Sequence, residues 1–445
     1  MDEPWLHELL ERAIADEPPI GPVAHNSLRA GLRRRRRRVQ GGAACAAAVA
    51  VIGAGVVAVT GAPGTPSATG SIPQTVYVLS DDGTSHDGTV TPISTATNIP
   101  GKPIAAGPQP QFMALTPNGQ TLYVADVLDT VTPIATATNT PGKPIKVGQQ
   151  PEQILVTPDG KTAYVADFSG VTPISTATNT PEKPITAVGS AGEGPRDMAI
   201  TPDGKTLYIA SGNIVIPVST ATNRPGKPIL LGDQVSSAFP SQVIITPDGS
   251  TLYVFRWNGS VNGNDNGVIT PVSTATNTPG QPIRVVADPQ FAVAVTPDGH
   301  TLYVVARNGK DVVPISTATN MPRQPINVAS GVYAIAVTPD GQTAYVASQC
   351  PFQVDRSLRL SCQRRPGEVT PISTATNTPG TPVKVSHGNL FMVIGGFYSF
   401  AITPDGKTIY IVSGEGGTVT PITTATNTAG KPVKVKGAQQ IVITP

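Results

Sequence analysis

Cysteine, histidine and tryptophan are scarce in this chain of 445 residues, which holds 3, 5 and 2 of them respectively. The histidines, His7, His25, His86, His300 and His387, are spread along the whole chain, so the sequence indicates no histidine-rich metal site. Charged residues make up only 13% of the chain, with 31 Lys and Arg against 29 Asp and Glu. Residues 1–38 hold 8 Arg and 6 acidic residues, which leaves 23 of each sign in the remainder. This balance argues against a nucleic-acid partner, because such a partner needs a concentrated basic surface.

What the chain has in abundance is one repeated pattern, which runs from about residue 75 to the last residue. Each unit contains an apolar segment ending in Thr-Pro, a turn that is usually Pro-Asp-Gly, an LYVA-like segment, a VTPI-like segment leading into Ala-Thr-Asn, and a short KPIKV-like segment. The Thr-Pro endings fall at Pro117, Pro158, Pro202, Pro247, Pro297, Pro339, Pro404 and Pro445. Short runs rich in Val, Ile, Tyr and Thr, separated by Gly, Pro, Asn and Asp, are typical of β-strands.

The four segments of a unit therefore predict four antiparallel strands, which we call A, B, C and D in chain order. Strands A and B are almost continuously apolar, so we expect both of their faces to be buried. One four-stranded sheet cannot bury both of its faces, but a closed ring of packed sheets can. A period of 40–50 residues with four strands is typical of propeller blades.

The run of Tyr-Val and small residues followed by Thr-Ala-Thr-Asn resembles the YVTN family of β-propeller repeats over everything after about residue 72. The resemblance implies an all-β propeller of four-stranded antiparallel blades. One departure is a proline inside every strand C, which predicts a short or irregular strand D opposite it, because proline cannot donate to a ladder. These prolines are Pro92, Pro133, Pro173, Pro217, Pro271, Pro314, Pro371 and Pro421.

The number of strands predicts how the ring closes. The first unit begins at strand B (residues 75–80) and the chain ends on a strand A (residues 439–445), so each strand type occurs eight times. We therefore expect eight blades, with seven as the alternative, and we expect the last strand to complete the blade that the first strands begin.

Residues before the repeats predict a membrane anchor. Residues 1–38 contain an amphipathic segment around Trp5 to Ile14, which would form a helix that lies on a membrane surface or docks a cytoplasmic partner, and an arginine run, Arg33 to Arg38. Residues 39–61 carry no charge and are long enough to span a bilayer. The arginines predict a cytoplasmic N-terminus and an extracytoplasmic propeller (residues 75–445) after a flexible stalk at 62–74. A cleaved signal peptide is the alternative.

The three cysteines fit this topology. Cys45 lies in the predicted span, where it acts as a small apolar residue. Cys350 and Cys362 flank one loop of the propeller and, outside the cytoplasm, predict a disulfide that closes it.

Two classes of function remain. We expect a binding or protein-interaction scaffold at the cell surface rather than an enzyme, and we assign no catalytic, cofactor-binding or metal-binding residue. The alternative is a lactonase-like hydrolase or a dehydrogenase, since both occur on propellers. The two tryptophans, Trp5 and Trp257, are too few to resemble the blades of quinone-dependent dehydrogenases, and no convergent His/Glu/Arg set is visible for a lactonase.

Loop lengths suggest where a partner would bind. The A–B and C–D turns should share one face of the disc and are nearly identical in every unit, whereas the B–C and D–A loops share the other face and vary in length. The long loops bring aromatic, Met and Arg side chains, the types enriched at interface anchors, to that second face. The predicted partner residues are Arg256, Trp257, Phe352, Arg356, Arg359, Phe391, Met392, Phe397 and Tyr398.

Overall fold

The computed structural model describes residues 74–81, 87–186, 194–231, 239–257, 267–285, 292–306, 309–328, 331–348, 353–354, 360–361, 367–385, 400–413 and 417–445. The predicted cytoplasmic segment, the predicted span at 39–61 and nearly all of the predicted stalk lie outside these residues. Within the described ranges, no helix has the length and apolar character needed to cross a membrane.

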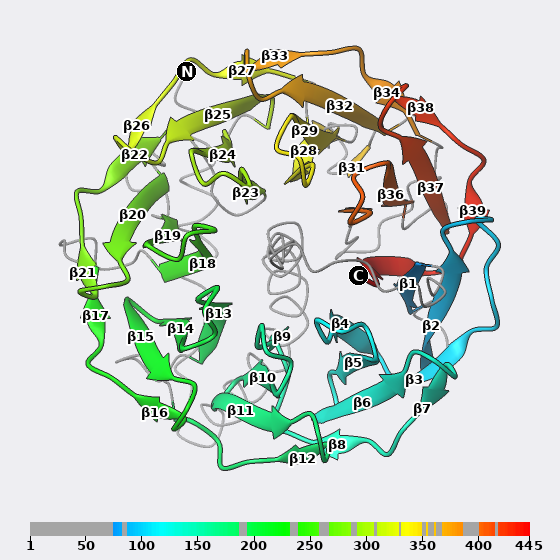
Figure 1. Cartoon of the computed structure of the whole chain (residues 1–445), viewed down its shortest axis with the longest axis vertical. Coiled ribbons are helices and arrows are strands. Elements are labelled where there is room, and N and C mark those ends of the chain that lie inside the picture. The colour runs from blue at the N-terminus through cyan, green and yellow to red at the C-terminus, as the bar shows by residue number, and fades with distance from the viewer. Residues whose placement is uncertain are drawn as a thin grey trace, which may run out of the picture. The chain divides into compact units, whose positions relative to one another are not determined.

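The described chain forms eight antiparallel sheets arranged as the blades of a ring (Figure 1). The predicted eight-bladed, all-β propeller is confirmed. We number the blades along the chain, so that blade 1 contains the first strand and blade 8 contains the last complete repeat. In each blade, strand A lies innermost, B and C follow, and D lies at the periphery.

The innermost strands A of blades 1 to 8 are β40 (Ala438–Ile443), β4 (Pro110–Leu115), β9 (Gln153–Val156), β13 (Pro195–Ile200), β18 (Phe239–Ile245), β23 (Val293–Val295), β28 (Val332–Val337) and β35 (Phe400–Ile402). Strands B are β1 (Thr75–Ser80), β5 (Thr121–Asp126), β10 (Thr162–Asp167), β14 (Thr206–Ser211), β19 (Thr251–Trp257), β24 (Thr301–Val305), β29 (Thr343–Ser348) and β36 (Thr408–Ser413).

Strands C are β2 (Asp87–Ser94), β6 (Thr130–Ala135), β11 (Gly170–Ser175), β15 (Ile214–Ser219), β20 (Gly267–Ser273), β25 (Asp311–Ser316), β32 (Glu368–Ser373) and β37 (Thr418–Thr423). The outer strands are β3 (Ile104–Pro108), β7 (Thr140–Pro141), β8 (Ile145–Lys146), β12 (Thr180–Pro181), β16 (Arg224–Pro225), β17 (Ile229–Leu230), β21 (Thr278–Pro279), β22 (Ile283–Val285), β26 (Met321–Pro322), β27 (Ile326–Asn327), β33 (Thr378–Pro379), β34 (Val383–Lys384), β38 (Thr428–Ala429) and β39 (Val433–Lys434). A separate hairpin joins β30 (Gln353–Val354) to β31 (Leu360–Ser361).

The outer strand is interrupted opposite the proline of strand C, as predicted. In blade 2, β7 pairs with one end of β6 and β8 with the other, on either side of Pro133. The carbonyl of Pro133 still accepts a hydrogen bond from the Gly142 N–H at 2.7 Å, because proline lacks only the donor. Equivalent bonds reach the corresponding proline carbonyl in the other seven blades. The proline therefore divides each outer strand into two short pieces.

The ring closes by combining the two ends of the repeat region, which confirms the predicted closure. Strand β40 pairs with β1 in register from Val76 opposite Ile443 to Leu79 opposite Gln440. The Thr75 N–H donates to Thr444 Oγ1 at 2.9 Å, and the Thr444 N–H donates to the Thr75 carbonyl at 3.0 Å. Blade 1 is thus built from residues more than 350 positions apart.

The core consists of one apolar layer at each junction between neighbouring blades. At the junction of blades 2 and 3, for example, Tyr123 and Val131 pack with Val165 and Ile174. The strand B residues after the first threonine are buried in almost every blade, as predicted. The prediction that strand A is buried on both faces is wrong for its last residues. Leu155 and Val156 remain half-exposed, because the innermost strand borders the centre of the ring.

Each tyrosine of strand B also makes a hydrogen bond to the next blade. Its hydroxyl donates to the side-chain oxygen of the asparagine that follows strand C, as from Tyr164 to Asn223 at 2.6 Å. The same bond occurs at all eight junctions, with distances of 2.6 to 2.8 Å. Every one of these asparagines has a positive φ between 50° and 56°, a region that asparagine tolerates better than most residues. The Tyr and Asn of the repeat therefore connect the blades.

Candidate functional site

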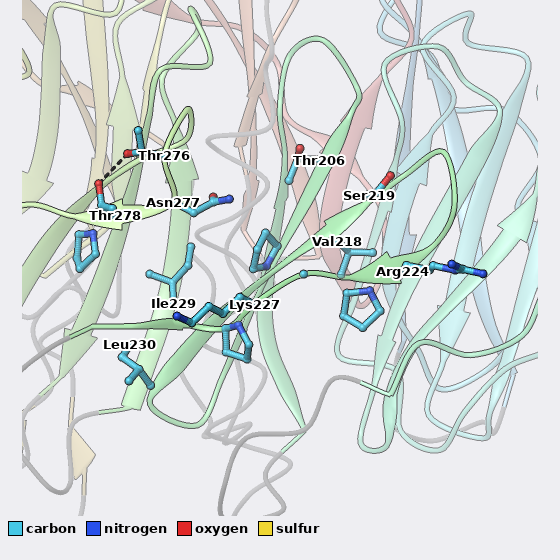
Figure 2. Close-up of a pocket in the computed structure, with 15 residues that line it drawn as sticks. Thr206, Val218, Ser219, Arg224, Lys227, Ile229, Leu230, Thr276, Asn277 and Thr278 are labelled. Atoms are coloured by element: carbon cyan, nitrogen blue, oxygen red, sulfur yellow. Dashed lines mark hydrogen bonds between the residues drawn. The ribbon is translucent and has the colours of Figure 1, made fainter.

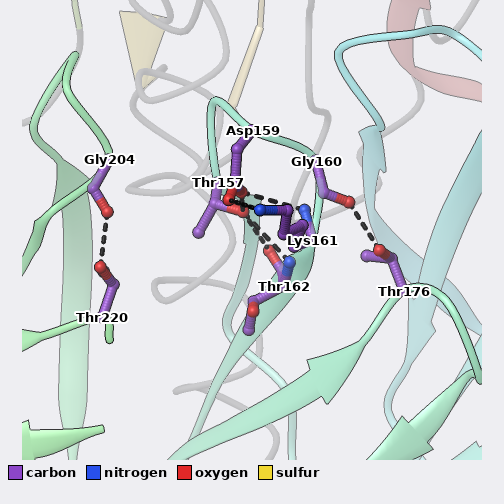
Figure 3. A network of polar contacts seen from close by, with 8 residues as sticks. All are labelled: Thr157, Asp159, Gly160, Lys161, Thr162, Thr176, Gly204 and Thr220. Carbon is purple, nitrogen blue, oxygen red and sulfur yellow. Dashed lines mark hydrogen bonds and ion pairs between the residues drawn. The ribbon is translucent and has the colours of Figure 1, made fainter. Parts of the chain in front are cut away.

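The face that carries the A–B and C–D turns satisfies its polar groups internally. In blade 3, Thr157 Oγ1 donates to Asp159 Oδ1 at 2.7 Å, and the Lys161 N–H donates to the same oxygen at 3.1 Å (Figure 3). These bonds lower the pKa of Asp159, with the Thr157 hydroxyl as the largest cause. Thr176 Oγ1 closes the turn by donating to the Gly160 carbonyl at 2.6 Å. We call this surface the turn face, and its repetition indicates a structural role.

The opposite face, which we call the loop face, carries the B–C and D–A connections. Most of the predicted partner residues lie outside the described residues, namely Phe352, Arg356, Arg359, Phe391, Met392, Phe397 and Tyr398. The backbone of Trp257 ends β19, and its side chain is not among those described. Cys350 and Cys362 also lie outside the described residues, so their pairing stays a prediction.

Arg256 is placed differently from the prediction, which put its side chain on the partner surface. Its side chain is only 1% exposed and its Nη2 donates to Thr270 Oγ1 of the neighbouring strand β20 at 3.2 Å. Arg256 lies within β19 and not in the loop that follows it, so its side chain projects from one face of the sheet, where it is covered. Arg256 therefore supports the loop face from within and offers no exposed contact.

Buried carboxylates at the ends of strands B shape the short B–C loops of blades 2 and 3. Asp126 ends β5 and accepts hydrogen bonds from the Leu128 and Thr130 N–H groups at 2.8 and 3.1 Å. Asp167 ends β10 and accepts from the Ser169 N–H and hydroxyl at 2.9 and 2.6 Å. Each aspartate thus fixes a tight B–C turn by bonding the backbone that follows it. Neither side chain is more than 1% exposed, so these carboxylates are structural.

Side chains from the first residues of strand A bridge neighbouring inner strands. Asp197 accepts from the Met198 N–H at 2.8 Å and from the Val243 N–H of the next blade at 2.7 Å. Gln153 Nε2 donates to the Met198 carbonyl at 3.2 Å. Burial raises the pKa of Asp197 to about 8, which outweighs the lowering by its backbone donors. These side chains satisfy backbone groups at sheet edges that have no ladder partner.

Gln242 occupies the equivalent position in blade 5. It is 2% exposed, and both its Oε1 and Nε2 lack a hydrogen-bond partner among the described residues. Gln440 of blade 1 is 5% exposed and has the same property. Buried amides without partners are uncommon in folded proteins. These two side chains therefore keep unused hydrogen-bond donors and acceptors at the start of strand A, on the side of the loop face.

Exposed or half-exposed charge lies beside this buried layer at blades 3 and 4. Glu152 is half-buried, and its burial raises its pKa, while Arg196 lowers it and Asp167 raises it. Arg196, one residue before Asp197, is exposed. Glu152 and Arg196 are therefore two charged residues of the loop face that solvent reaches. Within the described ranges, no group of three or more His, Cys, Asp or Glu residues is placed to hold a metal ion.

A concave surface lies at the periphery of blades 4 and 5 and was not predicted from the sequence. The groove has a volume of about 640 Å³ and runs between the two pieces of the outer strand of blade 4 and the C–D turn of blade 5 (Figure 2). Arg224, Lys227 and Leu230 lie along it, with Asn277 and Thr278 on the other side. The pattern in the sequence that could have indicated this surface is the repeated Pro-Gly-Lys-Pro of the outer strand.

Comparison with known proteins finds the fold but no family. No family model matches the chain, and no curated protein matches it. A hydrazine synthase chain from Kuenenia stuttgartiensis is 22% identical over 71% of this chain and 96% of its own length, with a TM-score of 0.50. The dihydro-heme d1 dehydrogenase NirN is 13% identical, over 85% of this chain and 77% of its own, with a TM-score of 0.64. A functionally unknown protein from Desulfotomaculum acetoxidans is 17% identical, over 73% and 99%, with a TM-score of 0.51.

These similarities correct one expectation. The sequence favoured a protein that is not an enzyme, yet two of the structures with this arrangement are named as a synthase and a dehydrogenase. Non-enzymatic function therefore does not follow from the propeller, and that prediction is wrong. At these identities the similarity shows the fold alone, and it assigns no reaction to this chain.

Proposed function

We propose that this protein is a membrane-anchored, extracytoplasmic propeller of the YVTN type that binds a partner through its loop face. The observation that carries the proposal is the contrast between its two faces. The turn face repeats one set of internal hydrogen bonds from blade to blade, whereas the loop face holds the loops of unequal length. Variation on a rigid scaffold is the usual arrangement of a binding surface.

The sequence supports the location. The arginine run at residues 33–38 precedes an uncharged stretch at residues 39–61, and the positive-inside rule then sends the propeller outward. Protease added to intact cells should remove the propeller and spare residues 1–38. Recovery of the propeller as a soluble, processed protein in the medium would instead support cleavage of a signal peptide.

The loop-face assignment is tested by shortening two loops. Residues 349–366, which connect β29 to β32, are replaced by the short turn of blade 2 between β5 and β6, and residues 386–399 are shortened likewise. Cross-linking on intact cells should then lose the partner captured by the wild-type chain, with melting of the ring unchanged. The matched control carries Lys161→Gln, Lys205→Gln and Lys407→Gln on the turn face and should keep the partner. Loss of capture in this control, with capture kept by the chain with shortened loops, would place the partner on the turn face.

Catalysis at the same face is a second candidate, which the solvent-accessible pair Glu152 and Arg196 favours. A glutamate whose pKa is raised by burial retains a proton to higher pH than a free one, and a general acid needs such a proton. Lactone hydrolysis or dye reduction by the purified chain, abolished by Glu152→Gln and kept by the turn-face control Asp159→Asn, would establish it. No turnover with either class of substrate would remove this candidate and leave binding.

A further inference from the structure

The charges of the ring are unevenly distributed although they nearly cancel in total. The outer edges of the blades are the segments that follow the strand C asparagine, at residues 98–106, 139–147, 179–186, 223–231, 277–285, 320–328, 377–385 and 427–435. Together these segments, which we call the outer rim, hold eleven Lys or Arg residues and one acidic residue, Glu182, a net charge of +10. All eleven basic side chains are exposed.

The basic residues of the rim differ from those of the turn face in their ion pairs. Within the described part of the chain, none of the eleven forms an ion pair. Lysines of the turn face behave differently, since Lys161, Lys205 and Lys407 lie 3.3 to 3.5 Å from the aspartate two positions earlier. The rim therefore presents free positive charge, and the turn face presents paired charge.

Protection of sheet edges explains part of this pattern. Lysine and proline on an outer strand discourage pairing with another chain, and this rim carries both. Glutamate and aspartate would also discourage pairing, yet Glu182 is the single acid in the eight segments. The prolines already interrupt every outer strand. The one-sided sign of the charge thus requires a second explanation.

The groove at blades 4 and 5 shows what the rim offers to a ligand. Arg224 and Lys227 lie along this groove beside the 70% exposed Leu230 (Figure 2). Pro225 and Pro228 also line it, and the turn of blade 5 adds polar side chains such as that of Asn277. The groove therefore combines cationic side chains with the apolar side chains of proline and leucine. None of the eight rim segments contains Phe, Trp or Tyr, so the rim has no aromatic side chain on which a nucleic-acid base could stack.

We propose that the outer rim binds a linear anionic glycopolymer of the cell envelope, through its repeated phosphodiester or carboxylate groups. The rim is curved and carries positive charge on successive blades, so a flexible polyanion gains a contact at each blade that it passes, and each contact releases counterions. The inference rests on the proposed function for the outward placement of the ring. It concerns a surface other than the loop face, so the two can fail separately.

The chain supplies its own design for a test. Five consecutive blades carry lysine directly before the last proline of the outer segment, at Lys431, Lys102, Lys143, Lys183 and Lys227. Blades 5 and 6 carry Gln281 and Gln324 at that position, so a Lys→Gln exchange introduces a residue that the fold already accommodates. The rim variant is Lys143→Gln, Lys183→Gln and Lys227→Gln. The control variant is Lys161→Gln, Lys205→Gln and Lys407→Gln, which removes the same charge from the turn face.

The measurement is binding of the purified full chain to poly(glycerol phosphate) and to polygalacturonate at several salt concentrations. We expect the rim variant to bind the preferred polymer at least tenfold more weakly than wild type at low salt, and to show a smaller salt dependence, by about 0.7 for each lost contact. The control variant should bind within twofold of wild type. The preferred probe distinguishes a phosphate-bearing from a carboxylate-bearing polymer.

Three results would overturn the proposal. Equal weakening by the two variants would mean that net charge, not the rim, attracts the polymer. Failure of the wild-type chain to bind either polymer would remove the ligand class. Tighter binding of single-stranded DNA than of both polymers would assign the rim to nucleic acid. Loss of polymer binding in the rim variant with retained capture at the loop face would support two separate surfaces.

Discussion

The hydroxyl of Tyr410 donates a hydrogen bond of 2.7 Å to Asn98, which lies 312 positions earlier in the chain. This bond joins blade 8 to blade 1 and repeats the one found at each of the other seven junctions. Closure of the ring therefore uses the same chemistry as its continuation, and the bond can be compared between junctions with few confounding differences.

The tyrosine–asparagine bond should contribute measurably to stability. Tyr410→Phe removes the donor and should lower the free energy of unfolding by about 1 kcal/mol, the usual net value of one hydrogen bond. Asn98→Gly removes the acceptor but keeps the positive φ, whereas Asn98→Ala removes the acceptor and strains the backbone. We therefore expect Asn98→Ala to destabilise more than Asn98→Gly. Denaturant unfolding of the single variants and of the Tyr410→Phe, Asn98→Gly pair gives the coupling energy, and strict additivity would mean that the bond contributes nothing.

Alkaline pH should weaken all the junctions together. Burial raises the pKa to about 12 for Tyr77, Tyr123, Tyr164, Tyr253, Tyr303 and Tyr410, against an ordinary value of 10. The unfolded chain loses these protons first, so the stabilisation is complete below pH 10 and declines as pH rises through about 12. Melting temperature should fall steeply across this window, in parallel with the tyrosinate absorbance. Ionisation near pH 10 without loss of structure would contradict the prediction.

The last strand should be required for a stable ring. Deleting residues 439–445 exposes the edge of β1 that pairs with β40 and removes Ile441, which is fully buried. Loss of that side chain alone costs about 1.5 to 3 kcal/mol, and the unpaired edge adds to it. We expect aggregation or a large drop in melting temperature, and calorimetry measures the latter. If the truncated chain has the same melting temperature as the full chain, β40 is dispensable.

Asp197 should make the ring less stable as pH rises from about 4 to about 8. Its pKa in the folded protein is about 8, and the unfolded value lies near 3.9, so the folded state holds a proton that the unfolded chain has lost. Asp197→Asn should abolish that part of the pH dependence, although it also weakens the bond from the Val243 N–H. Unfolding curves at pH 4, 6 and 8 test this, and Asp159→Asn at the turn face serves as the control. An unchanged pH dependence in Asp197→Asn would exclude this carboxyl as its source.

The repetition in the sequence predicted much of the fold, and the exceptions have physical causes. Strand order, the number of blades and the pairing of β1 with β40 follow from counting the segments that end in Thr-Pro. The tyrosine–asparagine bonds did not, since both residues have local roles in strand and turn that hide a contact across blades. Burial of Arg256 was missed because its position in β19 follows from register, whereas its residue type suggested the surface.

The candidate surfaces were less predictable. Counting 23 basic and 23 acidic residues gives only the total charge. The count does not show that basic residues gather on the outer edges of the blades. The outer rim became visible only when Lys102, Lys143, Lys183 and Lys227 were placed on equivalent outer edges. The loops that were predicted to bind a partner have the least repetition, so their sequence carried no pattern from which a structure could be derived.

The eight identical junctions also mean that the chain has no privileged starting point. Each tyrosine reaches forward to the following blade, and the bond from Tyr410 to Asn98 shows that this direction continues past the ends of the repeat region. A circular permutant in which residue 445 is linked to residue 74 and the chain is opened within another D–A connection would keep every one of these bonds. The position of the chain ends is then separable from the arrangement of the blades, so the blade that comes first along the gene could change without any change in the ring.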